Sequence, residues 1–242
     1  NVPEIALHNG QEILRSYKNS PNKYPTDDQA REMRRGYYAN ISYMDAQVGK
    51  VLDELDRLKL RDNTIIVLWS DHGFHLGENG LWAKTSNFEL DARVPVIIST
   101  PEFDAPQRTD SLVELLDIYP TLTELCQLQG PENLEGKSLV PILQNPKASI
   151  KQQALTQHCR PAYPPLGEDP EAMGYSIRTD RYRYTQWRDF HSHAVIATEI
   201  YDHNTDPLET KNIFENAPVR LKQRLAKQLE SVISKQVPRE QN

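Results

Sequence analysis

Apolar residues between positions 33 and 58 recur at steps of three and four, which places them along one face of an α-helix. Thr26, followed three positions later by Gln29, is typical of a capping box at a helix N-terminus. The sequence therefore predicts one long amphipathic helix that begins at Thr26. Its apolar stripe consists of Met33, Tyr37, Ile41, Met44, Val48, Val51, Leu55 and Leu58.

Two short apolar runs after this helix have the composition of strands. Residues 64–69 are uncharged and rich in β-branched side chains, which is typical of a strand buried on both faces of a parallel sheet. Residues 94–99 repeat the pattern, and Pro95 places the start of that strand near a sheet edge or strand end. Residues 110–116 predict a helix that Pro120 interrupts or restarts. This alternation of strands and helices predicts an α/β fold.

The pattern changes again in the last third of the chain. Aromatic and charged residues alternate over residues 173–188, which predicts an antiparallel hairpin with its turn at residues 178–181. Residues 199–202 have the composition of a third strand, and leucines at helical spacing predict a closing helix over residues 218–237. These elements together predict a small α+β subdomain.

We therefore expect three regions along the chain. Residues 1–25 are polar and contain three prolines, which favours a mobile leading segment over a folded element. Residues 26–150 carry the α/β pattern, and residues 151–242 carry the α+β pattern.

Composition excludes some classes of partner. The net charge is −6, and basic residues are matched by acidic ones, whereas a nucleic-acid partner requires a clustered positive surface. No apolar run in the sequence is long enough to span a membrane. Cys126 lies in an apolar pattern that predicts a small buried side chain in a helix, and Cys159 has no neighbours that would make it a nucleophile.

The stretch from Ser70 to Lys84 gathers the residues with the clearest chemistry. Asp71 and His72 directly follow the predicted strand, and ligands of α/β proteins bind outside the carboxyl ends of strands. A carboxylate suits Ca²⁺ or Mg²⁺, whereas an imidazole more often accompanies Zn²⁺, so the pair leaves the ion open. Lys84 could stabilise negative charge on an ester anion. The same residue types also occur as a turn aspartate, a solvated histidine and a surface lysine.

Several segments, taken in order, resemble the C-terminal half of a sulfatase, a member of the alkaline phosphatase-like superfamily. The resemblance runs from about residue 34 to about residue 212, and within the family it is closest to the branch that acts on iduronate 2-sulfate. It implies the C-terminal part of an alkaline-phosphatase-like α/β/α sandwich, followed by a small α+β subdomain with an antiparallel sheet and a terminal helix. The segments that carry it are residues 37–45, 63–66, 70–73, 77–84, 93–95, 117–122, 173–179, 182–185, 200–202 and 206–207.

The resemblance also assigns roles to individual residues. It implies that Asp71 and His72 are ligands of a divalent cation, usually Ca²⁺ in this family, and that Lys84 contacts the sulfate group. A histidine at this position also occurs in zinc phosphatases of the superfamily, so Mg²⁺ and Zn²⁺ stay open. Residues 157–161 resemble a segment that shapes the substrate pocket, which makes Arg160 and His158 candidates for contact with a sugar carboxylate or hydroxyl.

Two family features are missing from this sequence. Sulfatases use a cysteine, in a Cys-x-(Pro/Ala)-x-Arg motif, that is oxidised to formylglycine, together with an N-terminal pair of aspartates for the same metal; neither is present. The resemblance implies that a missing N-terminal half of the same protein supplies both, and that the protein is exported to the periplasm, the cell exterior or the lysosome. We expect the chain alone to be inactive, and either to expose apolar surface at residues 64–69 or to associate so that this surface is hidden.

Three functions stay open at this stage. The first is hydrolysis of sulfate esters of a sulfated carbohydrate, such as an iduronate 2-sulfate unit of a glycosaminoglycan. The second is a phosphatase or phosphodiesterase of the same superfamily, with Asp71 and His72 on zinc. The third is a non-catalytic sulfatase-like module. Lys84, within Gly80-Leu81-Trp82-Ala83-Lys84, fits the sulfatase pattern and favours the first.

Overall fold

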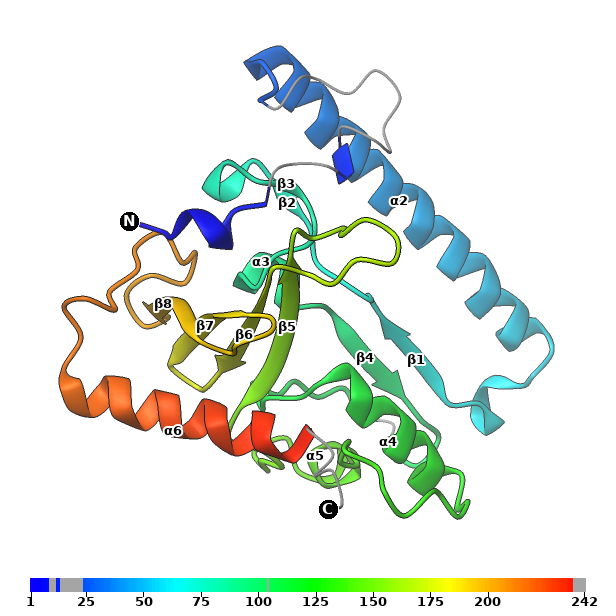
Figure 1. Ribbon diagram of the computed structural model, residues 1–242. Coiled ribbons are helices and arrows are strands. Elements are labelled where there is room, and N and C mark those ends of the chain that lie inside the picture. Colours follow the sequence, from blue (N-terminus) through cyan, green and yellow to red (C-terminus); the bar gives the residue numbers. More distant parts are fainter. Residues whose placement is uncertain (9–11, 14–23, 104, 237–242) are drawn as a thin grey trace. The chain divides into compact units, whose positions relative to one another are not determined.

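The computed structural model describes residues 1–8, 12–13, 24–103 and 105–236 (Figure 1). It divides into two compact units that interleave along the chain. The core unit comprises Asn9–Lys84 and Arg93–Pro106, and the C-terminal unit comprises Asn1–His8, Thr85–Ala92 and Gln107–Asn242. The domain boundaries expected after residues 25 and 150 divide the chain into contiguous parts, and they stay predictions.

The leading segment is ordered where the structure describes it. Glu4–Ala6 form the 3₁₀-helix η1, in which Ala6 is buried, so the expectation of an unfolded start is wrong for residues 1–8. Asn1 lies against Asn212: its amide Nδ2 donates to the Asn212 carbonyl at 2.5 Å, and its Oδ1 accepts from the Asn212 backbone at 3.1 Å. Most of the remaining leading segment lies outside the described residues.

The core unit contains the predicted long helix, α2, at Asp27–Arg57. The capping box is confirmed, since the Thr26 backbone donates to Gln29 Oε1 at 2.9 Å and the Gln29 backbone donates to Thr26 Oγ1 at 3.3 Å. The apolar stripe is mostly exposed, however. Within α2, all of which the structure describes, Ala30 is the only buried residue.

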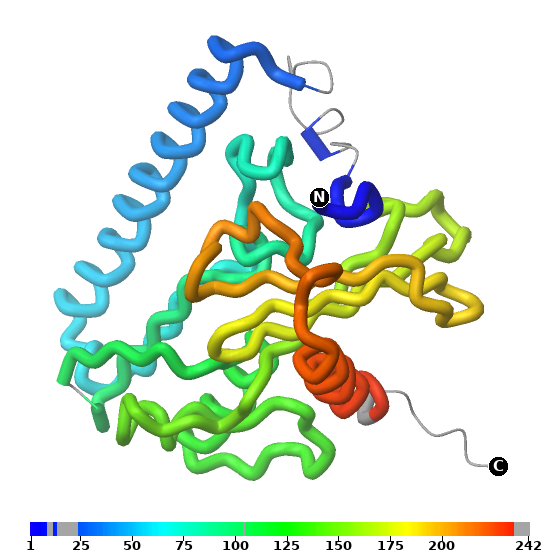
Figure 2. The backbone as a smooth tube through the Cα atoms, turned by 90° about the vertical axis from the view of Figure 1, so that its left-hand side faces the viewer, coloured from blue at the N-terminus to red at the C-terminus, as the bar shows by residue number. Residues whose placement is uncertain are grey.

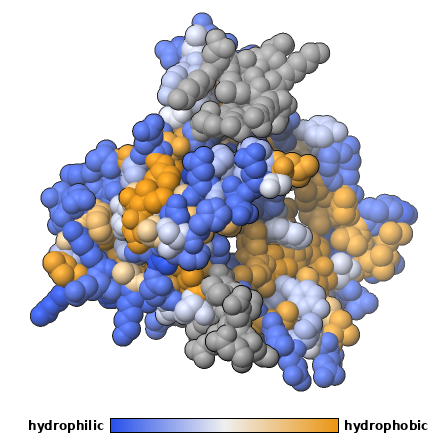
Figure 3. Space-filling model, in the orientation of Figure 1, coloured by the Kyte–Doolittle hydropathy of each residue, from blue (hydrophilic) through white to orange (hydrophobic). Residues whose placement is uncertain are grey.

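Two strands of the core unit pair with each other. β1, Ile66–Trp69, runs antiparallel to β4, Val96–Ser99, and is preceded by the 3₁₀-helix η2, Arg61–Asn63. The expectation of a strand buried within a parallel sheet is therefore wrong for the described chain, because an apolar run does not reveal the direction of its partner. Trp69 is 51% exposed and Ile97 is 60% exposed, and Figure 3 shows apolar residues gathered over these strands. The expected apolar surface at residues 64–69 is confirmed at Trp69, whereas residues 64–68 are half-buried.

The remaining elements of the core unit form a compact loop. β2, His75–Leu76, pairs antiparallel with β3, Trp82–Ala83, and the 3₁₀-helix η3, Glu78–Gly80, joins them. Trp82 and Ala83 pack against Ala30 of α2. The loop that carries the candidate chemistry is thereby attached to the long helix.

The C-terminal unit is built on a four-stranded antiparallel sheet in the order β5-β6-β7-β8. The predicted hairpin turn is confirmed, since Thr179 donates its backbone N–H to the Tyr182 carbonyl at 2.8 Å. The sequence reading missed β5, whose polar residues become a strand through pairing with β6. The strands are β5, Ala154–Arg160, β6, Ala172–Arg178, β7, Tyr182–Asp189, and β8, Val195–Asp202.

One face of this sheet is covered by the terminal helix α6, Val219–Gln236, as Figures 1 and 2 both show. Ile177, Tyr184 and Ile200 are paired across β6, β7 and β8 and form one apolar row. The fully buried Leu225 and Leu229 of α6 pack against this row. The predicted leucine stripe is therefore confirmed as core packing.

Short helices complete the C-terminal unit. The helix predicted over residues 110–116 begins later, because Glu114 and Asp117 form a capping box at its start. Pro120 lies in the first turn, where its missing N–H costs no helical hydrogen bond. Cys126 caps the end of this helix and is exposed, so the expectation of a buried thiol is wrong. The helices are η4, Leu115–Asp117, α3, Glu89–Ala92, α4, Ile118–Leu125, and α5, Val140–Gln144.

No helix among the described residues is long and apolar enough to cross a membrane.

Candidate functional site

Asp71 and Lys84 lie together in the core unit. Asp71 follows β1, Lys84 follows β3, and Lys84 Nζ is 3.9 Å from Asp71 Oδ2. The Asp71 side chain is 85% exposed, so this ion pair contributes little to stability. An exposed carboxylate beside an ammonium is instead available to contact other groups.

His72 adds an imidazole directly beside the carboxylate. Its Nδ1 is 3.1 Å from the Gly73 carbonyl oxygen. If Nδ1 donates to this oxygen, Nε2 carries the lone pair, and Nε2 is one of the two nitrogens through which a neutral histidine binds metal. The residue types and this tautomer fit a divalent cation at Asp71 and His72.

Two ligands do not complete a metal site. Zn²⁺ takes four ligands, and Ca²⁺ takes six to eight oxygens. Among the described residues, no third carboxylate, thiol or imidazole joins Asp71 and His72 in a group with metal-ligand spacing. Any cation held here would take its other ligands from outside this group.

Gly77 allows the loop to approach α2 closely. Its φ is +116°, and a Cβ there would lie 2.8 Å from Nη2 of Arg34 and 3.2 Å from the Trp82 ring. Arg34 also donates from Nε to the Leu76 carbonyl at 2.9 Å, and its guanidinium lies 5.4 Å from the centre of the Trp82 ring. The loop thus depends on glycine at this position.

The backbone on both sides of Lys84 is strained. Ala83 has φ +68° and Thr85 has φ +89°, a region that residues with a Cβ rarely occupy. A β-branched threonine is especially unfavourable there. Such conformations persist where surrounding contacts over-determine them, and they often occur at functional sites.

The other candidate site residues lie on β5 of the C-terminal unit. Arg160 is 8% exposed, and its guanidinium makes four hydrogen bonds with described residues, each to a carbonyl oxygen. It also lies 4.6 Å from the centre of the Trp187 ring. Burial lowers the pKa of Arg160 to about 10, which still leaves it charged at neutral pH. The acceptors are Ile5, Ala6, Thr85 and Cys159.

His158 is half-buried and lies two residues before Arg160, so the two side chains share one face of β5. A substrate contact by either residue stays a prediction. For Arg160, the contacts in the structure are to the backbone and to Trp187.

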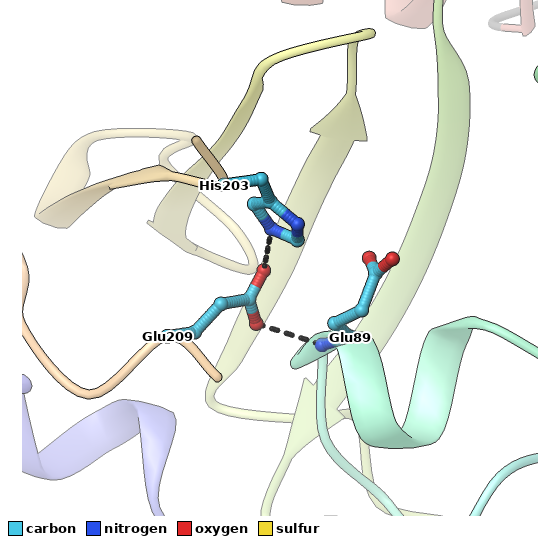
Figure 4. A group of neighbouring side chains, drawn as sticks. All are labelled: Glu89, His203 and Glu209. Carbon is cyan, nitrogen blue, oxygen red and sulfur yellow. Dashed lines mark hydrogen bonds and ion pairs between the residues drawn. The ribbon is translucent and has the colours of Figure 1, made fainter. Parts of the chain in front are cut away.

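A buried charged cluster was missed by sequence reasoning (Figure 4). Glu89, His203 and Glu209 have ligand atoms within 4.8 Å of one another. Arg183 lies among them, with Nη2 at 2.5 Å from Glu89 Oε2 and Nε at 2.6 Å from Glu209 Oε1. Because a guanidinium already neutralises both carboxylates, the cluster is an ion-pair network and does not suit a metal. Its members are too far apart in sequence to give a local signal.

The charges in this cluster are well defined. Arg183 holds the pKa of Glu209 below its usual value, despite the burial of that carboxyl group. Both glutamates in turn keep the pKa of Arg183 raised. His203 Nε2 lies 2.7 Å from Glu209 Oε1. Glu209 is therefore an anion held by several donors.

A second buried carboxyl group lies on β8. Glu199 accepts from Trp187 Nε1 at 2.7 Å and from the Tyr201 hydroxyl at 2.5 Å. Burial raises the pKa of Glu199 to about 7. Burial and this neighbouring carboxylate raise the pKa of Tyr201, which stays protonated. Glu199 therefore gains or loses its proton near neutral pH while it is buried in the C-terminal unit.

Comparison with known proteins gives consistent matches. Residues 7–128 match the model of the family described as "Sulfatase", and residues 77–235 match "N-sulphoglucosamine sulphohydrolase, C-terminal". Iduronate 2-sulfatase of Mus musculus is 35% identical over 253 residues, covering 79% of this chain and 45% of the mouse protein. Choline-sulfatase of Rhizobium meliloti is 35% identical over 195 residues, covering 79% of this chain and 35% of that protein.

The fold is also found among solved structures. A protein solved in complex with its substrate D-glucosamine-2-N,6-O-disulfate has a TM-score of 0.71 at 23% sequence identity, covering 98% of this chain and 54% of that chain. This likeness confirms the expected α/β fold class. The chain spans about half the length of this structure and of the mouse relative.

Proposed function

The chain belongs to the sulfatase family, and from this premise we propose that the protein of which it forms part hydrolyses sulfate esters. Asp71 and His72 would be two ligands of a divalent cation, and Lys84 would contact the sulfate group. The observation that carries this proposal is the 3.9 Å separation of Lys84 Nζ from the exposed Asp71 carboxylate. This separation brings a carboxylate oxygen and an ammonium group close together, which supports the proposed roles of the two residues.

Each residue has a distinct chemical task. The cation would polarise the sulfate oxygens as a Lewis acid. The Asp71 carboxylate and the His72 imidazole would hold that cation, while the Lys84 ammonium would stabilise negative charge that develops on the ester oxygens. The strained backbone around Lys84 supports a defined direction for its side chain.

The metal is proposed to be Ca²⁺, with Mg²⁺ and Zn²⁺ as alternatives. Asp71 offers a hard oxygen that suits Ca²⁺ or Mg²⁺, and His72 offers a nitrogen that suits Zn²⁺. Metal analysis of the intact protein, purified without added metal, would distinguish them. A purified protein with stoichiometric zinc would contradict the calcium assignment.

The nucleophile is proposed to be a formylglycine in the N-terminal half of the same protein. This chain's two cysteines are Cys126 and Cys159, and neither lies in the motif that becomes formylglycine. We therefore expect no turnover by this chain alone. Metal-dependent hydrolysis of a sulfate ester by the isolated chain would contradict this expectation.

The substrate is proposed to be a sulfated carbohydrate, with an iduronate 2-sulfate unit of a glycosaminoglycan as the specific candidate. The match to iduronate 2-sulfatase and the match to the sulphohydrolase C-terminal family support a sugar. The solved neighbour that binds a glucosamine disulfate supports it as well. Choline-sulfatase is equally identical to this chain, so choline sulfate is the control substrate. We also propose export of the protein, on the family resemblance.

A phosphatase or phosphodiesterase activity is the second candidate. The observation in its favour is the imidazole of His72 beside Asp71, because that pair also suits zinc. A non-catalytic sulfatase-like module is the third candidate, and a parent sequence without the cysteine motif and the aspartate pair would favour it.

One experiment tests these proposals together. The full-length protein is assayed on an iduronate 2-sulfate disaccharide, choline sulfate, 4-nitrophenyl sulfate and 4-nitrophenyl phosphate, with Lys84→Ala and Asp71→Ala alongside. We expect hydrolysis of sulfate esters that both substitutions remove. Dominant hydrolysis of the phosphate ester would refute the sulfatase proposal, and sulfatase activity unchanged in both variants would refute the roles of Asp71 and Lys84.

A further inference from the structure

We infer that Arg160, and Arg183 through its ion pairs, are positioning residues for Lys84. They act through the segment Thr85–Ala92, which we call the anchor segment. This inference rests on the proposed role of Lys84. The anchor segment begins at the residue joined to Lys84 by a peptide bond, and it belongs to the C-terminal unit. Its contacts there fix the backbone from which Lys84 extends.

The first contact is made by Arg160. Its Nη1 donates to the Thr85 carbonyl at 3.1 Å, and both residues are buried. Thr85 has φ +89°, which a threonine adopts only if its surroundings hold it there. The guanidinium of Arg160 supplies that constraint, because its other hydrogen bonds and its stacking on Trp187 prevent it from moving away.

The second contact is made by Asn87. Its Nδ2 donates to the Gly174 carbonyl on β6 at 3.1 Å. A Cβ at Gly174 would lie 2.6 Å from Asn87 Nδ2 and 2.7 Å from the Trp187 ring. The glycine therefore lets the anchor segment approach the sheet closely, which is a requirement of this contact and not of the strand itself.

The third contact is the ion-pair network around Glu89. Its backbone N–H donates to Glu209 Oε2 at 2.7 Å, and its carboxylate pairs with Arg183 at 2.5 Å and with Arg178 at 3.2 Å. Arg183 is 2% exposed and pairs with Glu209 as well. Both the backbone and the side chain of Glu89 are thus held by buried charged groups.

These contacts exceed what a single helical turn requires. The anchor segment contains α3, only four residues long, yet it is bonded to β5, β6, β7 and the segment after β8. Short surface connections normally make few buried polar contacts. Such a set of contacts is expected where the backbone must follow one defined path. Lys84 directly precedes the anchor segment, so its backbone is the one that these contacts affect.

The same observations separate positioning from substrate contact for Arg160. A residue that binds a substrate carboxylate needs donors directed at the substrate. The four hydrogen bonds of Arg160 go to backbone carbonyls, one of them on the neighbour of Lys84. The loss of Arg160 should therefore affect every sulfate ester alike, whether or not the substrate carries a carboxylate.

The test uses the full-length enzyme with Arg160→Lys, Arg160→Ala and the control Arg181→Ala. Arg181 pairs with Asp202 in the same unit, and none of its hydrogen bonds or ion pairs within the described part of the chain reaches the anchor segment. Rates are measured on an iduronate 2-sulfate disaccharide and on 4-nitrophenyl sulfate, which lacks a carboxylate. We expect kcat to fall by about 10²-fold on both substrates for Arg160→Ala, with KM changed by less than about threefold. Arg160→Lys should also lose activity, because an ammonium cannot reproduce four bonds in one plane.

A double-mutant cycle shows whether the effect passes through Lys84. In the Lys84→Ala background, Arg160→Ala should cause no further loss of kcat, because the group that it positions is absent. A loss restricted to the carboxylated substrate, with a raised KM, would show that Arg160 binds substrate instead. The same fold-loss with and without Lys84 would show a general structural role. Either result overturns the inference.

Hydrogen exchange supplies a readout that does not depend on activity. Backbone amides of residues 84–92 should exchange at least about tenfold faster in Arg160→Ala than in the wild type, and at the wild-type rate in Arg181→Ala. Unchanged exchange in Arg160→Ala, which would mean that the anchor is not needed, refutes the inference. If the wild type hydrolyses no sulfate ester, the proposed function fails, and the exchange data still decide whether Arg160 holds the segment.

Discussion

The charged residues of the two units differ in how they are satisfied. In the core unit, Asp71 is 85% exposed, and its recorded ion pair spans 3.9 Å. In the C-terminal unit, the side chains of Arg183 and Glu209 are 2% and 1% exposed and are joined at 2.6 Å. The groups proposed to act on substrate are therefore accessible and loosely paired, whereas the groups that hold the backbone are buried and fully paired.

The largest expected effect comes from removing an accessible group. In the full-length enzyme, Asp71→Ala should lower kcat/KM for a sulfate ester by at least about 10³-fold, because a metal ligand and its charge are lost. The melting temperature measured without metal should barely change, since substitutions at exposed sites usually alter stability by less than about 0.5 kcal/mol. Activity kept at the wild-type level would refute the assigned role.

Removing a buried charged group should, unlike the removal of Asp71, lower stability strongly. Glu209→Ala should destabilise the full-length protein by about 3–5 kcal/mol, because it leaves the Arg183 charge buried with half of its compensation. Denaturant unfolding, followed by tryptophan fluorescence, measures this change. A loss below about 1 kcal/mol would mean that solvent reaches the cluster and that the contrast between the units is weaker than described.

Glu199 gives the C-terminal unit a dependence on pH. Burial raises its pKa from 4.5 to about 7, so between these values the folded protein keeps a proton that the unfolded chain releases. The free energy of unfolding should therefore fall as pH rises from about 4.5 to 7, by an upper estimate of about 3 kcal/mol. Unfolding of the wild type and of Glu199→Gln across this range measures it. The free energy of unfolding of Glu199→Gln should not decline over this range. If the wild type and the variant decline equally, a group other than Glu199 causes the decline.

The smallest effect is expected at an exposed ion pair of the C-terminal unit. Arg181 donates to Asp202 at 2.8 Å and 2.6 Å, and this arginine side chain is half exposed. Arg181→Ala should cost about 0–1 kcal/mol, because solvent screens such pairs. Denaturant unfolding of Arg181→Ala and Glu209→Ala under the same conditions measures the difference between their stability losses. A cost equal to that of Glu209→Ala would show that burial does not govern these pairs.

The sequence predicted those elements whose signals are local. The Thr26 capping box located the start of α2, and the leucine spacing located α6, because caps and periodicity depend on near neighbours. The direction in which β1 pairs was predicted wrongly, and the strand β5 was not predicted. Both depend on pairing with segments distant in the chain, and residues 154–160 contain few β-branched residues.

Part of the candidate site was predictable because its residues are close together in the sequence. Asp71, His72 and Lys84 lie within 14 positions of one another, in a stretch that resembles a known family. The groups around the anchor segment are different. Glu89, Arg183 and Glu209 are separated by 94 and 26 positions, so no periodic pattern or short motif connects them. Only the folded chain brings them together.

The bond between Asn1 and Asn212 has a consequence for how the chain folds. The two residues are 211 positions apart, and the C-terminal unit is assembled from three separate stretches of sequence. Contacts between distant residues slow folding, because a large loop must close before they form. During synthesis, Asn1 leaves the ribosome long before Asn212, and it reaches this partner only after β8 has been made. The C-terminal unit should therefore be the last part of this chain to complete its structure. Until then its unpaired strands are exposed and available to a chaperone.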